Sequence, residues 1–479
     1  MFEKTNKKYS VAVIGDLILD VYKWGSCTKI SPEAPVQIVN LYKTSNLPGG
    51  AGNVAANLKK LTLEPKIYSV IGDDSTGTKL LKIFDNLSID RSNVLIESER
   101  LTSEKNRLIA RKQQIVRFDN EIIKPISVRS SKKLLQLFLK DLKSNKFDAV
   151  IISDYAKGVL SETLIQEIIK ACKKESIFVL CDPKGNNFKK YLGCTTITPN
   201  KKEASIASGI EIIDNITLKK AGSKLLEICK LDFLIITLSE EGIALFQKEK
   251  MFILNTNARE VFDVSGAGDT VISAITFGIL NNYGLKKSCE FANLGAEVVI
   301  SKFGTSTVSL KEINSLHHYS KENKIVNLEN LIKIIEFNKK IKKKIVFTNG
   351  CFDILHSGHV SYLEEASKFG EILIVGLNTD KSIKAIKGEK RPINSQEDRG
   401  KVLSGLKVVD FIVLFDDKTP IKLIEKILPD VLVKGSDYLD KEIVGSEIVE
   451  KNGGKIELIE FIEGKSTTAI IDKIKNIYK

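Results

Sequence analysis

Short apolar runs alternate with segments of helical periodicity along the first 308 residues of the chain. The clearest runs read as buried strands that each end in a polar residue, at 11–16, 149–154, 177–182 and 233–237. Segments with apolar residues at helical spacing, such as 161–174, separate them. This alternation is typical of a parallel sheet built from βαβ units. Ligands bind such sheets at the carboxyl ends of the strands, where Asp16, Asp154 and Asp182 stand.

A second series of the same kind fills the C-terminal part of the chain. Its strands are expected at 345–348, 372–376, 411–415, 431–434 and 456–459. Between the two series, residues 309–340 are rich in Lys, Asn and Glu and contain one helical segment, at 328–338. We therefore predict two α/β domains, at 1–318 and 343–479, joined by a linker at 319–342.

The composition narrows the class of protein. Hydrophobic residues make up 43% of the 479 residues, and no run approaches the roughly 18 uninterrupted apolar residues of a membrane span. The first residues contain no apolar signal region. Seven cysteines are scattered and never in C-x-x-C spacing, which favours reduced thiols over a disulfide or zinc framework. We therefore expect a cytoplasmic protein with no membrane partner.

The formal net charge of +13 suggests an anionic partner of some kind. Lysines are spread over the whole chain with Asp and Glu between them, and no basic patch is interleaved with aromatic residues as in single-strand binders. A lysine-rich genome is the simpler explanation, so we expect no nucleic-acid partner. The positive field would still attract sugar phosphates and nucleotides.

Two glycine-rich runs in the first half can handle a phosphorylated substrate. Residues 49–53, of sequence GGAGN, form a turn before a helix, where backbone amides can approach a ligand and Asn53 can bind hydroxyls. Residues 266–268 open another helix, whose free amides can hold a developing phosphate charge. Asp269 follows directly and can accept the proton of an attacking hydroxyl. A plain helix cap is the alternative role for Asp269.

A basic strand is predicted around residues 105–113. Alternation places Lys105, Arg107, Arg111 and Gln113 on one face of it. Such a face suits a sugar that already carries a phosphate. The alternative is a solvated edge strand, whose charges discourage aggregation.

Residues 8–308 resemble the ribokinase-like sugar kinases. The matching runs are 15–16, 48–53, 182–184, 198–203 and 263–270. The resemblance implies a ribokinase-like α/β domain with a small β lid, Asp269 as catalytic base, and Mg-ATP as donor, with Glu203 ordering the Mg²⁺ but no dedicated metal site. The runs 24–36, 105–114 and 154–160 resemble the heptose 7-phosphate kinase branch.

The same resemblance implies the ligand contacts of the kinase half. Those for ATP are Asn200, Lys201, Lys202, Glu203, Thr237, Ser239, Gly242, Gly266, Ala267 and Gly268. Those for the sugar are Asp16, Gly50, Asn53, Lys105, Arg107, Arg111, Lys157, Asp182 and Lys184.

A second phosphate-handling run, TNGCFDILHSGH, begins at Thr348. Its glycine allows close backbone approach, and His356 and His359 lie on one face at a helix start. There they can donate to a triphosphate and to the charge on departing pyrophosphate. A metal site would need a third ligand, which we cannot identify from the spacing. A purely structural histidine pair is the other alternative.

Runs downstream of the histidines add further polar groups. Asp380 ends a strand and can contact ribose or base, and residues 387–392 form a cationic turn. Arg399 and Lys434 add charges, and residues 465–468 open the last helix with a run of hydroxyls. Simple helix capping explains that hydroxyl run equally well.

Residues 343–479 resemble the cytidylyltransferase-like family, with a Rossmann-like α/β fold. The runs TNGCFD-x-L-H-x-G-H, VKG-x-DY and STT resemble its heptose 1-phosphate adenylyltransferase branch. The resemblance alone implies adenine over cytosine, and His356 and His359 as transition-state stabilisers. It also implies nucleotide and phosphate contacts from Asn349, Gly350, Cys351, Phe352, Asp380, Lys387, Arg399, Lys434, Ser466, Thr467 and Thr468.

Together the two halves resemble the bifunctional heptose kinase–adenylyltransferases of lipopolysaccharide precursor synthesis. The resemblance implies two Mg²⁺-dependent reactions: phosphorylation by ATP of D-glycero-β-D-manno-heptose 7-phosphate at O1, and adenylyl transfer from ATP to the 1-phosphate. The products of the second are ADP-heptose and pyrophosphate, and another enzyme must remove the 7-phosphate in between. A homodimer through the lid sheet is also implied. The alternatives are another sugar phosphate or CTP, a basic surface-binding protein with relic motifs, and one half turned into a nucleotide sensor.

Overall fold

The computed structural model describes residues 2–110, 113–144, 147–248, 250–256, 263–302, 304–317, 324–340, 343–436, 443–460 and 467–477. The chain divides into two compact units, Met1–Asn314 and Ser315–Lys479, and each is described by itself. Of the seven cysteines in the chain, all are free thiols, as expected from their scattered spacing. No helix among the described residues is long and apolar enough to cross a membrane.

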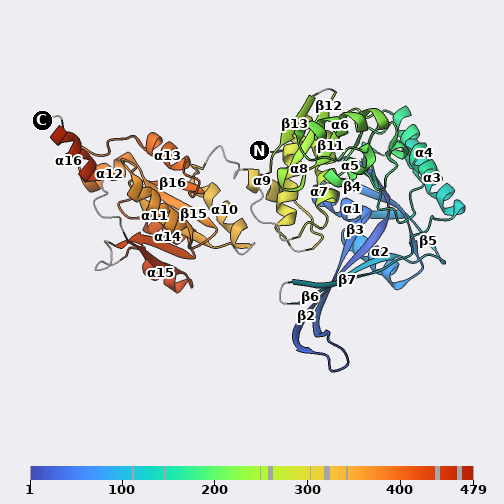
Figure 1. Cartoon of the computed structure of the whole chain (residues 1–479), viewed down its shortest axis with the longest axis horizontal. Coiled ribbons are helices and arrows are strands. Elements are labelled where there is room, and N and C mark those ends of the chain that lie inside the picture. The colour runs from blue at the N-terminus through green and yellow to red at the C-terminus, as the bar shows by residue number, and fades with distance from the viewer. Residues whose placement is uncertain are drawn as a thin grey trace. The chain divides into compact units, whose positions relative to one another are not determined.

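The N-terminal unit is built on a six-stranded parallel sheet (Figure 1). In spatial order its strands are β10 (Thr196–Ile197), β9 (Phe178–Asp182), β8 (Ala149–Ser153), β1 (Ser10–Gly15), β4 (Glu64–Gly72) and β5 (Asp90–Glu97). Both faces of the central strands are buried, which is why their sequences are continuously apolar. The carboxyl ends of β1, β8 and β9 meet at one edge, and this edge holds the predicted site residues.

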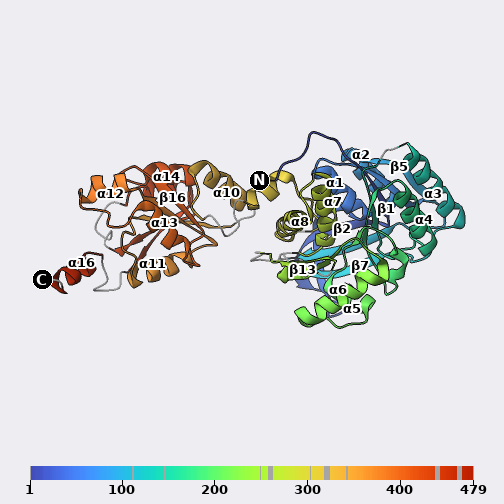
Figure 2. The same cartoon turned by 90° about the horizontal axis from the view of Figure 1, so that it is seen from above.

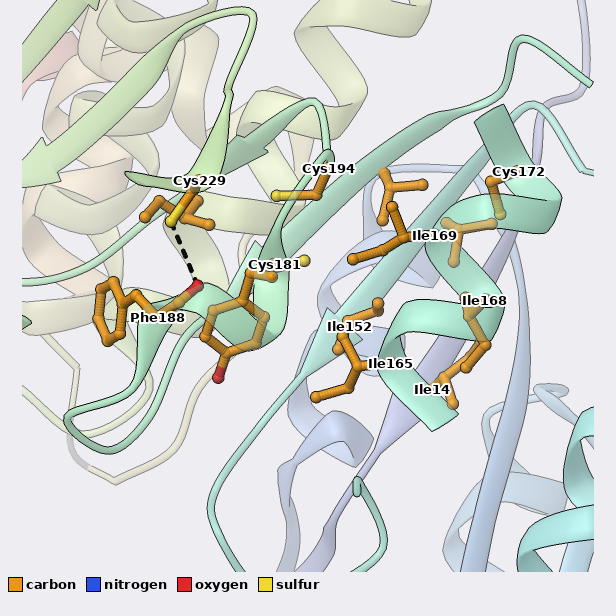
Figure 3. Packing of buried hydrophobic residues seen from close by; sticks show 14 of the residues in the cluster. Ile14, Ile152, Ile165, Ile168, Ile169, Cys172, Cys181, Phe188, Cys194 and Cys229 are labelled. Carbon is orange, nitrogen blue, oxygen red and sulfur yellow. Dashed lines mark hydrogen bonds between the residues drawn. The ribbon is translucent and has the colours of Figure 1, made fainter. Parts of the chain in front are cut away.

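Helices cover both faces of this sheet. The helices of the unit are α1 (Ala51–Lys60), α2 (Ser75–Asn86), α3 (Val128–Lys143), α4 (Glu162–Lys174), α5 (Lys201–Ser208), α6 (Asn215–Cys229), α7 (Ala267–Leu280) and α8 (Leu285–Ile300), with short 3-10 helices η1 (Phe188–Tyr191) and η2 (Ser239–Glu241). Helix α9 (Leu310–His317) contains the boundary between the two units. Ile14 and Ile152 point to the core under α3, α4 and α6, where Cys181, Cys194 and Cys229 are also buried (Figure 3). On the opposite face α1 packs against α7, and α7 and α8 lie side by side (Figure 2).

A four-stranded lid sheet projects from the edge of the main sheet (Figure 1). Its order is β3 (Gln37–Gly50), β2 (Leu17–Ile30), β6 (Ser103–Ala110) and β7 (Gln113–Asn120). Strand β2 pairs antiparallel with β3 and parallel with β6, and β6 pairs antiparallel with β7. Only Asp16 separates β1 from β2, so the lid continues the first strand of the main sheet.

A third, three-stranded sheet consists of β11 (Leu234–Thr237), β12 (Ile243–Gln247) and β13 (Lys250–Leu254). We expected 233–237 to be a strand of the parallel sheet, but β11 pairs antiparallel with β12. A parallel bridge between Asn200 and Thr237 is its link to the main sheet. Its apolar run is buried in either arrangement, so the pattern alone could not distinguish them.

The C-terminal unit has a five-stranded parallel sheet with helices on both faces. Its strand order is β16 (Phe411–Phe415), β15 (Ile372–Asn378), β14 (Ile345–Gly350), β17 (Val431–Gly435) and β18 (Lys455–Ile459). Its helices are α10 (Leu328–Lys340), α11 (Ser357–Ser367), α12 (Asp380–Lys387), α13 (Gln396–Ser404), α14 (Ile421–Ile427), α15 (Ser446–Lys451) and α16 (Thr467–Ile477). The chain order reverses between β14 and β17, so a ligand crevice is expected at their carboxyl ends.

The segment predicted as a linker, 319–342, contains a helix that belongs to the C-terminal unit. Leu331, Ile334 and Ile335 of α10 are buried in the core that also holds Phe347 and Phe411. The boundary between the two compact units falls earlier, after Asn314. The apolar positions of α10 have i, i+3, i+4 spacing, which marks a buried helix face despite the surrounding lysines.

Candidate active sites

Asp269 lies in the first turn of α7, behind a glycine in the left-handed conformation. Gly266 is the N-cap residue with φ +78°, and a Cβ there would lie 2.5 Å from Asn53 Nδ2. No side chain caps this helix, so its first backbone amides are not occupied by a capping residue. The Asp269 carboxylate therefore does not cap the helix, which was the alternative role for it.

The Asp269 carboxylate is buried and held by two donors. Asn53 Nδ2 donates to Oδ2 at 2.7 Å, and the Tyr155 hydroxyl donates to Oδ1 at 2.8 Å. Burial raises the pKa of Asp269 to about 7, while the hydrogen bonds from Asn53 and Tyr155 oppose the rise. A pKa close to neutrality suits a general base at physiological pH.

Two more carboxylates face the same region. Burial, together with the charges of Asp269 and Glu203, raises the pKa of Asp182 well above its usual value. Lys184 Nζ lies 2.6 Å from Glu203 Oε1 and offsets part of this negative charge. Asp269, Asp182 and Glu203 thus form an acidic edge beside the start of α7.

Asn200 and Glu203 form a capping box at the start of α5. Asn200 Oδ1 accepts the Glu203 backbone N–H at 2.9 Å, and Glu203 Oε2 accepts the Asn200 backbone N–H at 3.0 Å. Lys201 Nζ reaches Glu241 of η2 at 3.5 Å, and Thr237 bridges to Asn200. The predicted ATP residues of both segments therefore share one edge, except Lys202, which is exposed.

Asp16, which we had predicted to bind the sugar, is held by backbone groups of its own chain. It is 1% exposed, and its carboxylate accepts backbone N–H groups of Tyr155, Lys157 and Val159 at 3.0, 3.1 and 3.0 Å. These three donors, all from one turn, occupy most of the acceptor sites of the carboxylate. Asp16 is therefore a residue that holds the turn after β8, and the residue type at the end of a strand could not tell the two roles apart.

The inner face of the lid carries alternating charges. The strand register puts Asp20, Lys105 and Asp119 in one row, and Tyr22, Arg107 and Arg117 in the next. Lys105 of the predicted basic face thus has an acidic residue opposite it on each neighbouring strand, whereas Arg107 lies opposite Tyr22 and Arg117. Arg111 of that face lies outside the described residues.

Arg107 and Lys105 of this face differ in their partners. Arg107 Nη1 lies 2.5 Å from Asp20 Oδ1, and its guanidinium stacks 5.1 Å from the Tyr22 ring. In the part of the chain that the structure describes, no carboxylate lies within ion-pair distance of Lys105. Burial and the charges of Arg117 and Lys157 lower the pKa of Lys105. Lys105 is thus the cation best suited to meet a ligand anion.

Two residues of this site escaped sequence reasoning. Asp20 is 4% exposed and close enough to raise the pKa of Asp269. The Asp20 carboxylate can pack against the backbone of β3 because residue 49 is a glycine, where a Cβ would lie 2.3 Å from Asp20 Oδ2. Tyr155, the second, directly follows Asp154. The signal available for Asp20 was a lone carboxylate inside the apolar run 17–22, because a buried charge needs a partner.

The histidine pair of the C-terminal unit lies at the start of α11. His356 is the N-cap residue, and the His356 and His359 rings stack with centroids 3.8 Å apart. The Phe352 ring packs 5.2 Å from His359. Burial, His356 and the Lys387 ammonium lower the pKa of His359 to about 4. His359 is therefore neutral at physiological pH.

Asp353 ties the histidine run to the cationic turn. It accepts the Arg391 guanidinium at 2.5 Å and the backbone N–H groups of Ile393 and Asn394 at 2.7 and 3.0 Å. Arg391 of the predicted phosphate-binding turn is thus partly neutralised. Asp353 was not among the predicted site residues, and only its place within the run hinted at it.

We had predicted that Arg399 contacts phosphate, but its side chain is enclosed by the protein. Its side chain is 0% exposed and bonds to Asp380 Oδ1 at 2.6 Å. It also donates to the backbone carbonyls of Asn394, Cys351 and Asn378, at 3.1, 2.6 and 2.9 Å. Arg399 therefore fixes three loops around the crevice, and its pairing with Asp380 leaves that carboxylate only partly available to a ribose.

Four other predicted residues lie near the start of α11. Lys434, at the end of β17, donates to the Asn349 side-chain oxygen at the end of β14. The Lys387 ammonium acts on the pKa of both His359 and Cys351. Burial raises the pKa of the Cys351 thiol, so it stays protonated.

The hydroxyl run of the last helix is described only in part. Thr467 begins α16, whereas Ser466 and the side chain of Thr468 lie outside the described residues. Across the described residues of both units, no group of three or more His, Cys, Asp or Glu could hold a metal ion.

Comparisons with known proteins agree with this architecture. Residues 8–313 match the pfkB family carbohydrate kinases, and residues 347–473 match the cytidylyltransferase-like family. The chain is 48% identical to the bifunctional protein HldE of Aliarcobacter butzleri over 98% of each chain, and 46% identical to that of Geobacter metallireducens over 97% and 96%.

Solved structures match the N-terminal part. An Arabidopsis thaliana ribokinase solved with ribose and ATP covers 66% of this chain and 100% of its own, with a TM-score of 0.53 and 18% identity. Phosphofructokinase-2 of Escherichia coli covers 65% and 99%, with a TM-score of 0.54 and 17% identity. These matches confirm the predicted fold class, a ribokinase-like α/β domain followed by a nucleotidyltransferase-type α/β domain.

Proposed function

The chain belongs to the family of the bifunctional protein HldE, in which a carbohydrate kinase and a nucleotidyltransferase are joined, and from this we propose that it makes ADP-heptose in two steps. The N-terminal unit phosphorylates O1 of D-glycero-β-D-manno-heptose 7-phosphate with ATP. The C-terminal unit joins AMP from ATP to heptose 1-phosphate and releases pyrophosphate. Between the steps a separate phosphatase must remove the 7-phosphate. We place both steps in the cytoplasm, where ATP and reduced thiols occur together.

The observation that carries the kinase assignment is the Asp269 carboxylate at the start of α7. The free amides there, opened by Gly266, suit the charge of the transferring phosphoryl group. Asp269, with a pKa of about 7, accepts the proton from O1–H as O1 attacks the γ-phosphorus and the bond to ADP breaks. Lys105 on the lid is placed to meet the 7-phosphate of the sugar.

The acidic edge fits a magnesium ion brought by ATP. Asp182 and Glu203 offer the carboxylate oxygens that Mg²⁺ prefers, and a bound Mg²⁺ would favour the ionised form of Asp182, whose pKa is raised in its absence. Mg²⁺ bound there would screen the charge of the triphosphate. Glu203 and Asp182 are the residues that would hold it, with most of its ligands from phosphate and water.

The transferase assignment rests on the stacked histidines at the start of α11. A neutral His359 offers one N–H donor to the triphosphate, and the helix start favours negative charge beside it. Lys387 adds a positive charge near the same ring. These groups stabilise the negative charge that builds on pyrophosphate as it departs. The preference for adenine follows from family membership.

Product analysis by mass spectrometry tests both steps. With heptose 7-phosphate, ATP and Mg²⁺ we expect the 1,7-bisphosphate, and with heptose 1-phosphate, ATP and Mg²⁺ we expect ADP-heptose and pyrophosphate. Fructose 6-phosphate and ribose serve as alternative acceptors, and CTP as an alternative donor. Efficient turnover of one of these, with the heptose phosphates inert, would contradict the heptose assignment. Omitting Mg²⁺ should abolish both products.

A homodimer through the lid explains its exposed apolar side chains. Val116 and Phe118 on one face of β7 are 45% and 46% exposed, and Leu41 and Tyr42 on β3 are 53% and 72% exposed. Apolar groups gathered on a projecting sheet mark an interaction surface. A second copy of the chain is the occupant that the family relation favours.

We expect Phe118→Glu to convert a dimer into a monomer, because burying a carboxylate in the interface costs free energy even with the Lys23 ammonium nearby, which lies 5.0 Å from the Phe118 ring centroid. Sedimentation or light scattering should show the mass halved. Ile96→Glu is the matched control, since Ile96 is 56% exposed on β5, outside the lid, and its change should leave the mass as it is. A dimer that survives Phe118→Glu would argue against the lid as the interface.

A further inference from the structure

Tyr155 contacts the base of the kinase site directly. Its hydroxyl lies 2.8 Å from Asp269 Oδ1, opposite the oxygen that Asn53 holds at 2.7 Å. Burial and the charges of Asp269 and Asp182 raise the pKa of Tyr155 well above its usual value. The phenol therefore stays protonated and acts as the donor in this hydrogen bond.

The turn that carries Tyr155 is fixed by its backbone. Its N–H bonds to Asp16 Oδ2 at 3.0 Å, and the next N–H, of Ala156, bonds to Asp154 Oδ1 at 2.8 Å. Ala156 has φ +53°, a conformation that costs energy for a residue with a side chain. Gly158 has φ +102°, and a Cβ there would lie 1.9 Å from the Lys124 carbonyl oxygen. Two aspartates therefore hold the tyrosine in one place.

The ring of Tyr155 also reaches the sugar side of the site. Lys105 Nζ of the lid lies 5.5 Å from its centroid, within the range of a cation–π interaction. Tyr155 thus connects the lid cation to the base, and it belongs to neither of the glycine-rich runs.

We propose that Tyr155 is a positioning residue for phosphoryl transfer: its hydroxyl orients the Asp269 carboxylate and favours its charged, proton-accepting form, while its ring supports Lys105. This inference rests on the proposed role of Asp269 as the base. In the transfer step the proton of the sugar hydroxyl passes to Asp269, and Tyr155 keeps its own proton throughout. Asn53 holds the second oxygen, so the two donors together fix the rotation of the carboxylate.

Tyr155→Phe tests the proposal in the full chain. Without the hydroxyl the pKa of Asp269 should rise, so the acid limb of kcat/KM for the kinase reaction moves to higher pH. A hydrogen bond to a charged group corresponds to a shift of about one unit. We therefore expect a loss of about tenfold at pH 6.5 that largely disappears by pH 9.

Tyr191→Phe is the matched control. The Tyr191 hydroxyl donates to Asp154 at 2.7 Å, so this change also removes a buried phenol hydrogen bond, but not one to the base. Its acid limb should coincide with that of the wild type. ATP binding by calorimetry and the thermal melting curve show whether each variant is folded.

Two results would overturn the proposal: an acid limb of Tyr155→Phe that coincides with the wild type, or a folded variant whose loss is equal at every pH. Asp269→Asn separates this failure from that of the proposed function. If that variant keeps its kinase activity, the assignment of the base is wrong, whatever Tyr155→Phe does.

Discussion

Asp269→Asn is expected to lower the rate of sugar phosphorylation about a thousandfold, because the amide cannot accept the proton of the attacking hydroxyl. Its shape is preserved, so the contacts to Asn53 and Tyr155 can be rearranged within the same space. Adenylyl transfer should be unchanged, since His356 and His359 belong to the other compact unit. Coupled assays of ADP and pyrophosphate release on one preparation measure both reactions.

The same substitution should stabilise the protein at alkaline pH. The pKa of Asp269 is about 7 in the folded state against 3.8 as its ordinary value. A raised carboxyl pKa means that the folded state binds the proton more tightly than the unfolded state. This proton binding adds to the free energy of unfolding below pH 3.8, and the added stability is lost as the pH rises through 7. At pH 8.5 the loss amounts to about 4 kcal/mol at most. The melting temperature of Asp269→Asn should exceed that of the wild type at pH 8.5, with the gap closing near pH 5.

A variant that melts below the wild type at pH 8.5 would contradict the buried, proton-binding environment described for Asp269. Kinase activity that survives the substitution would contradict its role as the base. The melting temperature and the kinase activity are independent tests, because thermal melting is measured without substrate.

His359→Asn should lower adenylyl transfer by about a hundredfold to a thousandfold, because it removes a donor placed for the departing pyrophosphate. Kinase activity of the same preparation is the internal control. Pyrophosphate release from heptose 1-phosphate and ATP is the measurement. Retained turnover would favour the purely structural role for the histidine pair.

The pH dependence of His359 has the opposite sign to that of Asp269. Its pKa is about 4 when folded against 6.5 as its ordinary value. A depressed histidine pKa contributes stability that is present above pH 6.5 and is lost as the pH falls through 4. His359→Asn should therefore lose less stability than the wild type as the pH falls from 6.5 to 4. Thermal melting of the variant and the wild type at pH 7 and pH 5 measures this difference.

Site residues could be predicted from the sequence where a residue type and a local backbone conformation both point to the same role. Glycine at 266 and the carboxylate three residues later define the start of α7, and the structure buries that carboxylate between two donors. Sequence alone could not assign Asp16 or Arg399, because a charged residue at a strand end serves a ligand or a loop equally well. Which role it has depends on partners distant in sequence, such as the N–H of Val159 for Asp16 or the Cys351 carbonyl for Arg399.

Tyr155 and Asp20 illustrate the remaining limit. Neither belongs to a glycine-rich run, and each acts on Asp269 only because the fold brings the turn after β8 and strand β2 close to the start of α7. The helix α10 is different, since its apolar spacing was visible and only the lysine-rich composition concealed it. The spacing of apolar residues is thus a better guide to burial than the composition of a segment. Which polar residues contact one another is decided by the packing of the folded chain.

The single residue between β1 and β2 determines which alternate side chains of β2 lie on each face of the lid. Because side chains alternate along a strand, the number of residues from Asp16 to Asp20 decides which set faces the base. One inserted residue at this junction would place Leu19 and Val21 where Asp20 and Tyr22 lie, so apolar side chains would replace a carboxylate and a phenol on that face of the lid. An insertion of two residues there would keep the alternation of side chains, whereas an insertion of one would reverse it.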